Sequence, residues 1–345
     1  MTNPQVPSAI EQAGAQLMGW ARGEPTVGPV AVVEQGAAVQ WLHEQGHALL
    51  SEDGLVLCAL PRRAELTVPT GPGVWLRGTG AMSSPGDDVG LSRDLYVQTT
   101  DYSAHRYLSV IGPTVLRLFT VEDATAFCTD VASALTSGAF PEALLHPLVE
   151  IGDRCAIAGG PCPGRSLGRL HVDRDGVVRT SPVGRQLGKA GDDPGVLREA
   201  ASRSSDPCLQ EDVGAVVAPT AVAAAAFLAG LDAARVLAQR SRSTWSMVGW
   251  QKDLFGGPGC DSPRADQFLL SDGTNDVLYD NTTRRAFRLE RPAAEVAEAV
   301  LMSGDDAAAA QRLHERGRDG VSVDDVQRFR EEFRSRGLEL AHAGA

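Results

Sequence analysis

Two short β-type segments and the turn between them decide the fold expected for the last quarter of the chain. The first segment is DVLYD (Asp276–Asp280), the turn is NTT (281–283), and the second segment is RAFRL (Arg285–Leu289). Branched and aromatic residues stand among polar ones in both segments, as in half-buried strands. We therefore expect a β-hairpin at this point.

Three helices are expected after this hairpin. Pro292 suits the first turn of a helix, where a missing N–H costs no hydrogen bond, and apolar residues follow it at helical spacing. A second helix is expected over 305–316, with Gly317 as its C-terminal stop. Ser322, with an acid three residues later, predicts the N-cap of a third helix that ends before Gly337-Leu338. This order of elements is that of a winged helix.

The C-terminal segment resembles the precursor-recognition domains of pathways that make ribosomally synthesised, modified peptides. The prototype is the small chaperone of pyrroloquinoline quinone biosynthesis. Its pattern is matched by the two β segments, by PAAEV (292–296) and by Gly337-Leu338, over roughly 75 of 345 residues. The resemblance implies a PqqD-like winged helix-turn-helix domain over 266–345 that binds the leader of a precursor peptide.

Strand addition is the binding mode that the resemblance implies. An unpaired strand edge presents N–H and C=O groups with which an extended peptide can pair. In family members the leader lies between the third strand and the last helix. The matching positions here are Ala286, Phe287, Arg288 and Leu289 on the strand, and Val326, Phe329, Arg330 and Phe333 on the helix.

The apolar members of this set have a second interpretation, because a small domain also needs a core. The residues open to both interpretations are Phe287, Leu289, Val326 and Phe329. Arg288 and Arg330 suit contacts with an acidic leader, although exposed arginines are also ordinary solvated charge.

A winged-helix transcriptional regulator is one alternative, since the same element order occurs in repressors. Between Asp266 and Leu340 there are 11 Arg, no Lys and 16 Asp or Glu, a net charge of −5. Phosphate contacts need a basic surface. The whole chain carries −12, which also disfavours polyanionic partners. We expect a peptide rather than nucleic acid as the ligand.

The first 240 residues are predicted to form a mixed α/β body, which makes the chain α+β. Strands are expected over Val30–Val33, Leu55–Leu60 and 115–119, and helices over 38–45 and 121–135. A hairpin is expected from Arg169–Val172 and 177–180. The glycine-rich stretch 71–80 lacks the Lys-Ser/Thr of a phosphate loop, so we expect a plain loop. Residues 241–265 are rich in Gly and Pro and are predicted to be a linker, although Trp245 and Trp250 indicate that part of it packs.

A zinc metallopeptidase is a second alternative. Residues 43–47 read HEQGH and match the pattern H-E-x-x-H, in which His43 and His47 bind zinc beside the general base Glu44. However, Gly46 suits a helix stop, which would turn the two histidines apart. We do not expect catalysis from this motif.

Cysteine usage favours a reduced cytoplasmic setting, because the six cysteines are dispersed without a repeated short spacing. Cys155 and Cys162 lie in a Gly/Pro-rich stretch with only His171 nearby as a further ligand, so we expect two ordinary thiols and no metal or cofactor.

No secretory signal is evident at the N-terminus. The uncharged segment 213–231 is interrupted by Pro219 and predicts a buried helix rather than a membrane span.

These observations favour a non-catalytic recognition protein. The C-terminal domain is expected to bind a precursor leader, and the body over 1–240 to dock a modifying enzyme of the same pathway. The layout resembles the recognition proteins of daptide-type pathways. That resemblance implies a partner oxidoreductase and no chemistry in the recognition protein itself.

Overall fold

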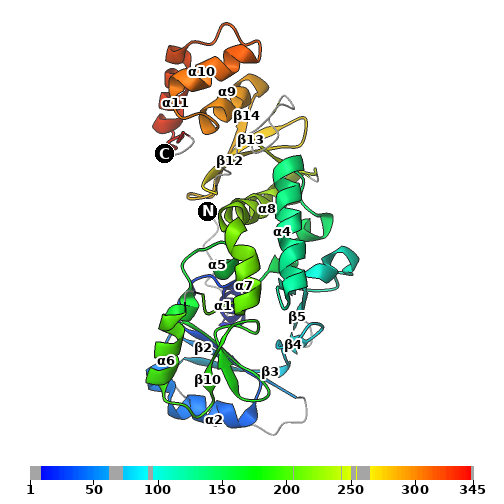
Figure 1. The fold of residues 1–345 in the computed structure, drawn as a ribbon, viewed down its shortest axis with the longest axis vertical. Coiled ribbons are helices and arrows are strands. Elements are labelled where there is room, and N and C mark those ends of the chain that lie inside the picture. Colours follow the sequence, from blue (N-terminus) through cyan, green and yellow to red (C-terminus); the bar gives the residue numbers. More distant parts are fainter. Residues whose placement is uncertain are drawn as a thin grey trace. The chain divides into compact units, whose positions relative to one another are not determined.

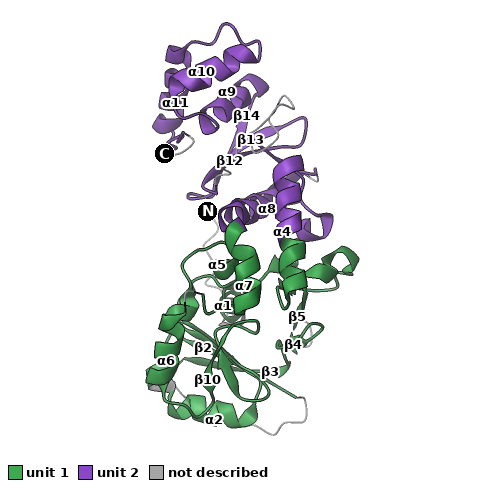
Figure 2. Ribbon diagram, viewed as in Figure 1, with its two compact units in different colours: residues 1–127, 148–219 green, residues 128–147, 220–345 purple. Residues whose placement is uncertain are grey.

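The computed structural model describes residues 9–61, 73–91, 96–204, 206–241, 243–249, 254 and 265–342. The chain divides into two compact units (Figure 2), with residues 1–127 and 148–219 in unit 1 and residues 128–147 and 220–345 in unit 2. The predicted boundary at 240–266 therefore needs correction. A helix before it and a strand within the predicted linker both pack with the C-terminal segment.

Unit 1 contains one ten-stranded mixed sheet, in the order β10-β9-β8-β1-β2-β3-β4-β5-β6-β7 (Figure 1). Its strands are β1 (Val30–Val33), β2 (Leu55–Leu60), β3 (Val74–Gly80), β4 (Asp88–Gly90), β5 (Tyr96–Asp101), β6 (Thr114–Arg117), β7 (Val149–Ile151), β8 (Arg169–Val172), β9 (Val177–Arg179) and β10 (Gln186–Lys189). Neighbouring strands from β8 to β3 and from β5 to β7 are parallel, and the remaining pairs are antiparallel.

Unit 1 contains one long helix, α1, and several shorter ones. They are α1 (Ala9–Arg22), α2 (Gly36–Glu44), α3 (Gly46–Leu49), η1 (Tyr102–Tyr107), α5 (Arg154–Ile157), η3 (Pro163–Ser166), α6 (Pro194–Arg203), α7 (Glu211–Val217) and η4 (Ala218–Thr220), together with the start of α4 (Val121–Ser137), which continues into unit 2. Thr120 caps α4: its hydroxyl accepts a hydrogen bond from the Asp123 N–H at 3.2 Å.

Alternate residues of β1 build two separate cores, as the period of a strand requires. Val30 and Val32 belong to the cluster that contains α1, whereas Ala31 and Val33 belong to the cluster that contains α2. The sheet curls around α1. Trp20 of α1 stacks on arginines from both β6 and β8, although five strands separate these two in the hydrogen-bonding order.

Unit 2 contains a four-stranded antiparallel sheet, in the order β11-β12-β13-β14, followed by three helices (Figure 1). Its elements are the end of α4, η2 (Glu142–Leu145), α8 (Ala221–Ser241), β11 (Ser246–Val248), β12 (Gln267–Ser271), β13 (Asp276–Asp280), β14 (Arg285–Leu289), α9 (Arg291–Leu301), α10 (Asp306–Glu315) and α11 (Val323–Ser335). One buried cluster joins the sheet to α9, α10 and α11.

Several predicted elements are confirmed, and others are wrong. The hairpin segments of the C-terminal quarter are β13 and β14 with the predicted bounds, and β8 and β9 form the second predicted hairpin. The predicted loop at 71–80 is wrong for Val74–Gly80, which forms β3 and pairs with β2 and β4. The predicted linker contains β11, and Trp245 beside it is buried. Trp250 lies outside the described residues.

The uncharged segment forms α7, η4 and α8, a helical stretch over 211–241 that is long and apolar enough to cross a membrane by length and composition. Within unit 2, α8 has the contacts of a core helix. Its Phe227 packs on the ring of Phe140 with centroids 5.5 Å apart, and the Arg235 Nε donates to the carbonyl of Leu144 at 2.6 Å.

Candidate peptide-binding edge

Strand β14 forms one edge of the sheet in unit 2. It pairs with β13 on one side, and no strand among the described residues pairs with its other side. The opposite edge strand, β11, is covered: the Met247 N–H donates to the carbonyl of Gly138 at 2.8 Å. Gly138 has φ +75°, and a Cβ there would lie 2.3 Å from the Met247 carbonyl oxygen, so glycine permits this close approach. The open edge of the sheet is thus β14.

The side chains of β14 alternate between two faces. Phe287 and Leu289 are half-buried and pack against the domain core, whereas Ala286 and Arg288 are exposed on the other face. The Phe287 ring meets Phe333 of α11 with centroids 5.7 Å apart. An extended peptide paired with β14 would therefore lie beside an apolar surface.

Helix α11 contributes one half-exposed aromatic residue to this surface. The Phe329 ring lies 4.9 Å from that of Phe333 between centroids, and it packs on the core from the outside. Val326 and Phe333 are instead buried, at 0% and 4% exposure. Val326 therefore belongs to the core, and the buried Phe333 packs against the ring of Phe329. Of the apolar helix positions predicted to contact a leader, Phe329 is the accessible one.

Arg330, which is predicted to contact a leader, has partners within its own domain. Its Nη1 lies 3.0 and 3.2 Å from the two carboxylate oxygens of Asp306, and its Nε donates to the carbonyl of Leu340 at 3.2 Å. The side chains of the pair are only 20% and 16% exposed. The guanidinium thus joins α11 to α10 and to the C-terminal segment.

Three arginines remain on the turn and strand at the open edge. Arg284, Arg285 and Arg288 stand within TRRAFRL (283–289), which contains no acidic residue. Arg285 donates from Nη1 to the Arg336 carbonyl at 2.8 Å and stacks on Phe287, and Arg288 donates to the side chain of Asn275. A local basic strip therefore borders the apolar surface of an otherwise acidic segment.

The H-E-x-x-H motif does not lie on one continuous helix. Helix α2 ends at Glu44 with Gln45 as its C-cap, and α3 begins at Gly46. The predicted stop at Gly46 is therefore wrong by one residue, because Gly46 opens the next helix and has no positive φ. The His43 ring packs edge-on against Trp75 with centroids 6.0 Å apart. The side chain of His47 lies outside the described residues.

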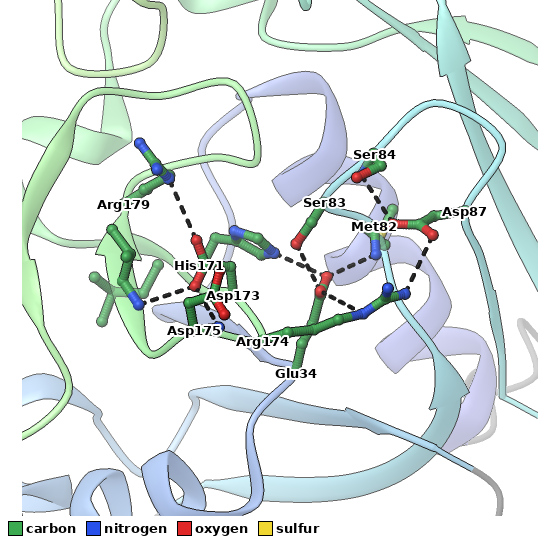
Figure 3. Close-up of polar contacts among 12 residues, drawn as sticks. Glu34, Met82, Ser83, Ser84, Asp87, His171, Asp173, Arg174, Asp175 and Arg179 are labelled. Carbon is green, nitrogen blue, oxygen red and sulfur yellow. Dashed lines mark hydrogen bonds and ion pairs between the residues drawn. The ribbon is translucent and has the colours of Figure 1, made fainter.

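A buried polar network in unit 1 was not predicted from the sequence (Figure 3). The Glu34 carboxylate follows β1 and accepts hydrogen bonds from the Met82 N–H and the Ser83 hydroxyl, both at 2.6 Å, and from His171 Nε2 at 2.9 Å. Burial alone would raise the pKa of Glu34, but these hydrogen bonds and the His171 charge hold it below its ordinary value. Arg174 bridges Glu34 to Asp87 at 3.9 and 3.2 Å. With its oxygens so occupied, Glu34 ties together three strand ends and is poorly suited to act as a base.

The signal that could have indicated this network is positional. Glu34 directly follows one parallel strand, and His171 lies on the strand paired with it, in register with Val32. Sequence patterns do not tell which parallel strands are neighbours, because β1 and β8 are about 140 residues apart.

Comparisons with known proteins found no family model, no curated protein and no solved structure that matches this chain. The candidate edge combines a strand with no partner among the described residues on its outer side, a half-exposed apolar surface and a basic strip.

Proposed function

We propose that the chain is a non-catalytic recognition protein for a ribosomally synthesised, modified peptide. Unit 2 contains a PqqD-like winged helix that captures the leader of the precursor by adding it as a strand beside β14. Unit 1 docks the modifying enzyme, an oxidoreductase in a daptide-type pathway. The observation that carries the proposal is the open edge of β14 next to Phe287, Leu289 and Phe329.

Two features of the β14 edge would favour binding of an extended peptide: its unpaired outer backbone groups and the apolar surface beside them. A leader strand would satisfy the outer N–H and C=O groups of β14, and its alternate side chains would cover the half-exposed rings. Backbone pairing supplies affinity that depends little on sequence. Specificity would come from the apolar surface and from the basic strip, which suits an acidic leader.

The test uses the full-length chain and a synthetic leader of the precursor peptide encoded beside its gene. Hydrogen exchange with and without the peptide should show new protection of the amides of β14 (Arg285–Leu289), because strand addition places them in a ladder. A scrambled leader is the control. Binding without protection of β14, or protection of β11 (Ser246–Val248) instead, would contradict this mode of binding.

A further inference from the structure

Two cysteines from one stretch of the chain and a third, 46 residues further on, meet in unit 1. Cys155 lies in α5, Cys162 precedes η3, and Cys208 precedes α7. The Sγ atoms of Cys155 and Cys162 are 3.8 Å apart, those of Cys162 and Cys208 are 3.1 Å apart, and all three lie within 4.8 Å of one another. Among the residues that the structure describes, this is the group of side chains that could hold a metal ion.

The three sulphurs are close enough for one small ion to bind all of them: the Cys155–Cys162 distance of 3.8 Å is that of an occupied site, and the Cys162–Cys208 distance of 3.1 Å is shorter. A tetrahedral zinc ion with Zn–S bonds of about 2.3 Å holds its sulphur ligands about 3.8 Å apart. A disulfide requires about 2.05 Å, and all three residues are free thiols. An iron–sulphur cluster is a poorer fit, since each cysteine would bind a different iron and the sulphurs would spread further.

The charge around the group favours thiolates. Arg117 and Arg169 are fully buried, and both pair with Asp153, at 2.6 and 2.7 Å. This trio retains one excess positive charge in a medium where an uncompensated charge is costly. Three thiolates on a divalent ion carry one negative charge, which offsets it. Arg169 faces the group: a Cβ added at Gly23 would lie 2.7 Å from the Cys155 sulphur and 3.4 Å from Arg169 Nη1.

Two glycines also leave room for the sulphurs. Besides Gly23, which has φ +75°, Gly164 approaches so closely that a Cβ there would lie 2.9 Å from the Cys208 sulphur. Any larger residue at either position would push on a ligand atom.

We propose that Cys155, Cys162 and Cys208 form a site for one zinc ion, with a fourth position occupied by water or a small ligand. His171, the further ligand that lies near Cys155 and Cys162 in the sequence, is hydrogen-bonded to Glu34 and is not part of the group. Asp206 lies at the margin of the site, where its carboxylate accepts the Cys208 N–H at 3.1 Å. The ion would join α5, η3 and the segment before α7, which have little regular structure of their own.

The first experiment measures metal in the full-length protein purified under reducing conditions from zinc-supplemented medium. We expect about one zinc per chain, and less than about a tenth of that in Cys162→Ser and Cys208→Ser. Cys128→Ser, a half-buried cysteine in the other unit, is the matched control and should retain the ion. Wild-type protein that binds no zinc, or variants that retain it in full, would overturn the proposal.

A second measurement does not depend on whether the variants fold. Wild-type protein stripped with a chelator is titrated with cobalt(II), whose tetrahedral thiolate complexes absorb strongly in the visible and near-ultraviolet. We expect these bands to appear at one equivalent and to disappear on addition of zinc, with three thiols protected from alkylation. Octahedral cobalt spectra, or a mass two hydrogens lower that reports a Cys162–Cys208 disulfide in the reduced preparation, would count against a metal site. Either result leaves the leader-binding test unaffected.

Discussion

The rings of Phe287 and Phe333 meet edge to face at 66°, with centroids 5.7 Å apart, and so join the open strand β14 to helix α11. This contact sets the distance between the strand edge and the helix. A peptide paired with β14 would find Phe329, one helical turn before Phe333, at its side.

Phe329→Ala should weaken leader binding about tenfold, or about 1.4 kcal/mol, because the half-exposed ring is lost while the buried Phe333 remains. Fluorescence anisotropy with a labelled leader and the full-length chain measures this. Val323→Ala, an exposed apolar position at the start of the same helix, should leave the affinity unchanged. Equal effects of the two substitutions would remove Phe329 from the proposed surface.

Arg330→Met should destabilise unit 2 by about 1.5–3 kcal/mol, because it leaves Asp306 and the Leu340 carbonyl without this donor. Urea unfolding measures the change in the free energy of unfolding, and hydrogen exchange of the amides of α10 and α11 shows where the loss occurs. Arg328→Met is the matched control: its pair with Asp325 is 74% and 44% exposed, so the change should stay within about 0.5 kcal/mol. A large loss of leader affinity at unchanged stability would return Arg330 to the binding surface.

Glu34→Gln should destabilise unit 1 at neutral pH by about 1–3 kcal/mol, because a buried, hydrogen-bonded carboxylate is replaced. The pKa of Glu34 in the folded protein is below its ordinary value of 4.5. Its ionised form therefore stabilises the fold above about pH 4.5, and this stabilisation is lost as the pH falls from there through the folded pKa. The difference between wild type and variant should therefore shrink below about pH 4.5. Exposed Glu52→Gln should show no such difference in urea unfolding at any pH.

Gly138→Ala should destabilise unit 2 by about 1–3 kcal/mol, since φ is +75° and the new Cβ would clash with the Met247 carbonyl. Gly214→Ala, in helix α7 with open space around the added methyl, should instead be stabilising by about 0.5–1 kcal/mol. Relative to wild type, the melting temperature should fall for Gly138→Ala and rise for Gly214→Ala. An unchanged melting temperature for Gly138→Ala would contradict the close approach of Gly138 to the Met247 carbonyl.

Elements with strong local signals were predicted closely. Asp305 and Ser322 cap α10 and α11, and Ser322 forms a reciprocal capping box with Asp325. The candidate edge was predicted only in part. The family resemblance implied that Phe287 and Phe329 lie beside the expected peptide, but it did not separate them from the buried Val326. Nor did it indicate that Arg330 pairs with Asp306, because that contact depends on how two helices pack.

The sequence by itself determined the order and bounds of the last strands and helices, because caps, turns and residue periodicity act over a few neighbouring residues. Only the tertiary structure decided that β8 lies beside β1, and that Cys208 joins Cys155 and Cys162 across 46 residues. Such contacts arise when distant segments close on a common core, and no short pattern records that closure. The strands and helices beside the proposed peptide edge could thus be predicted from the sequence, whereas the proposed zinc site appears only in the folded chain.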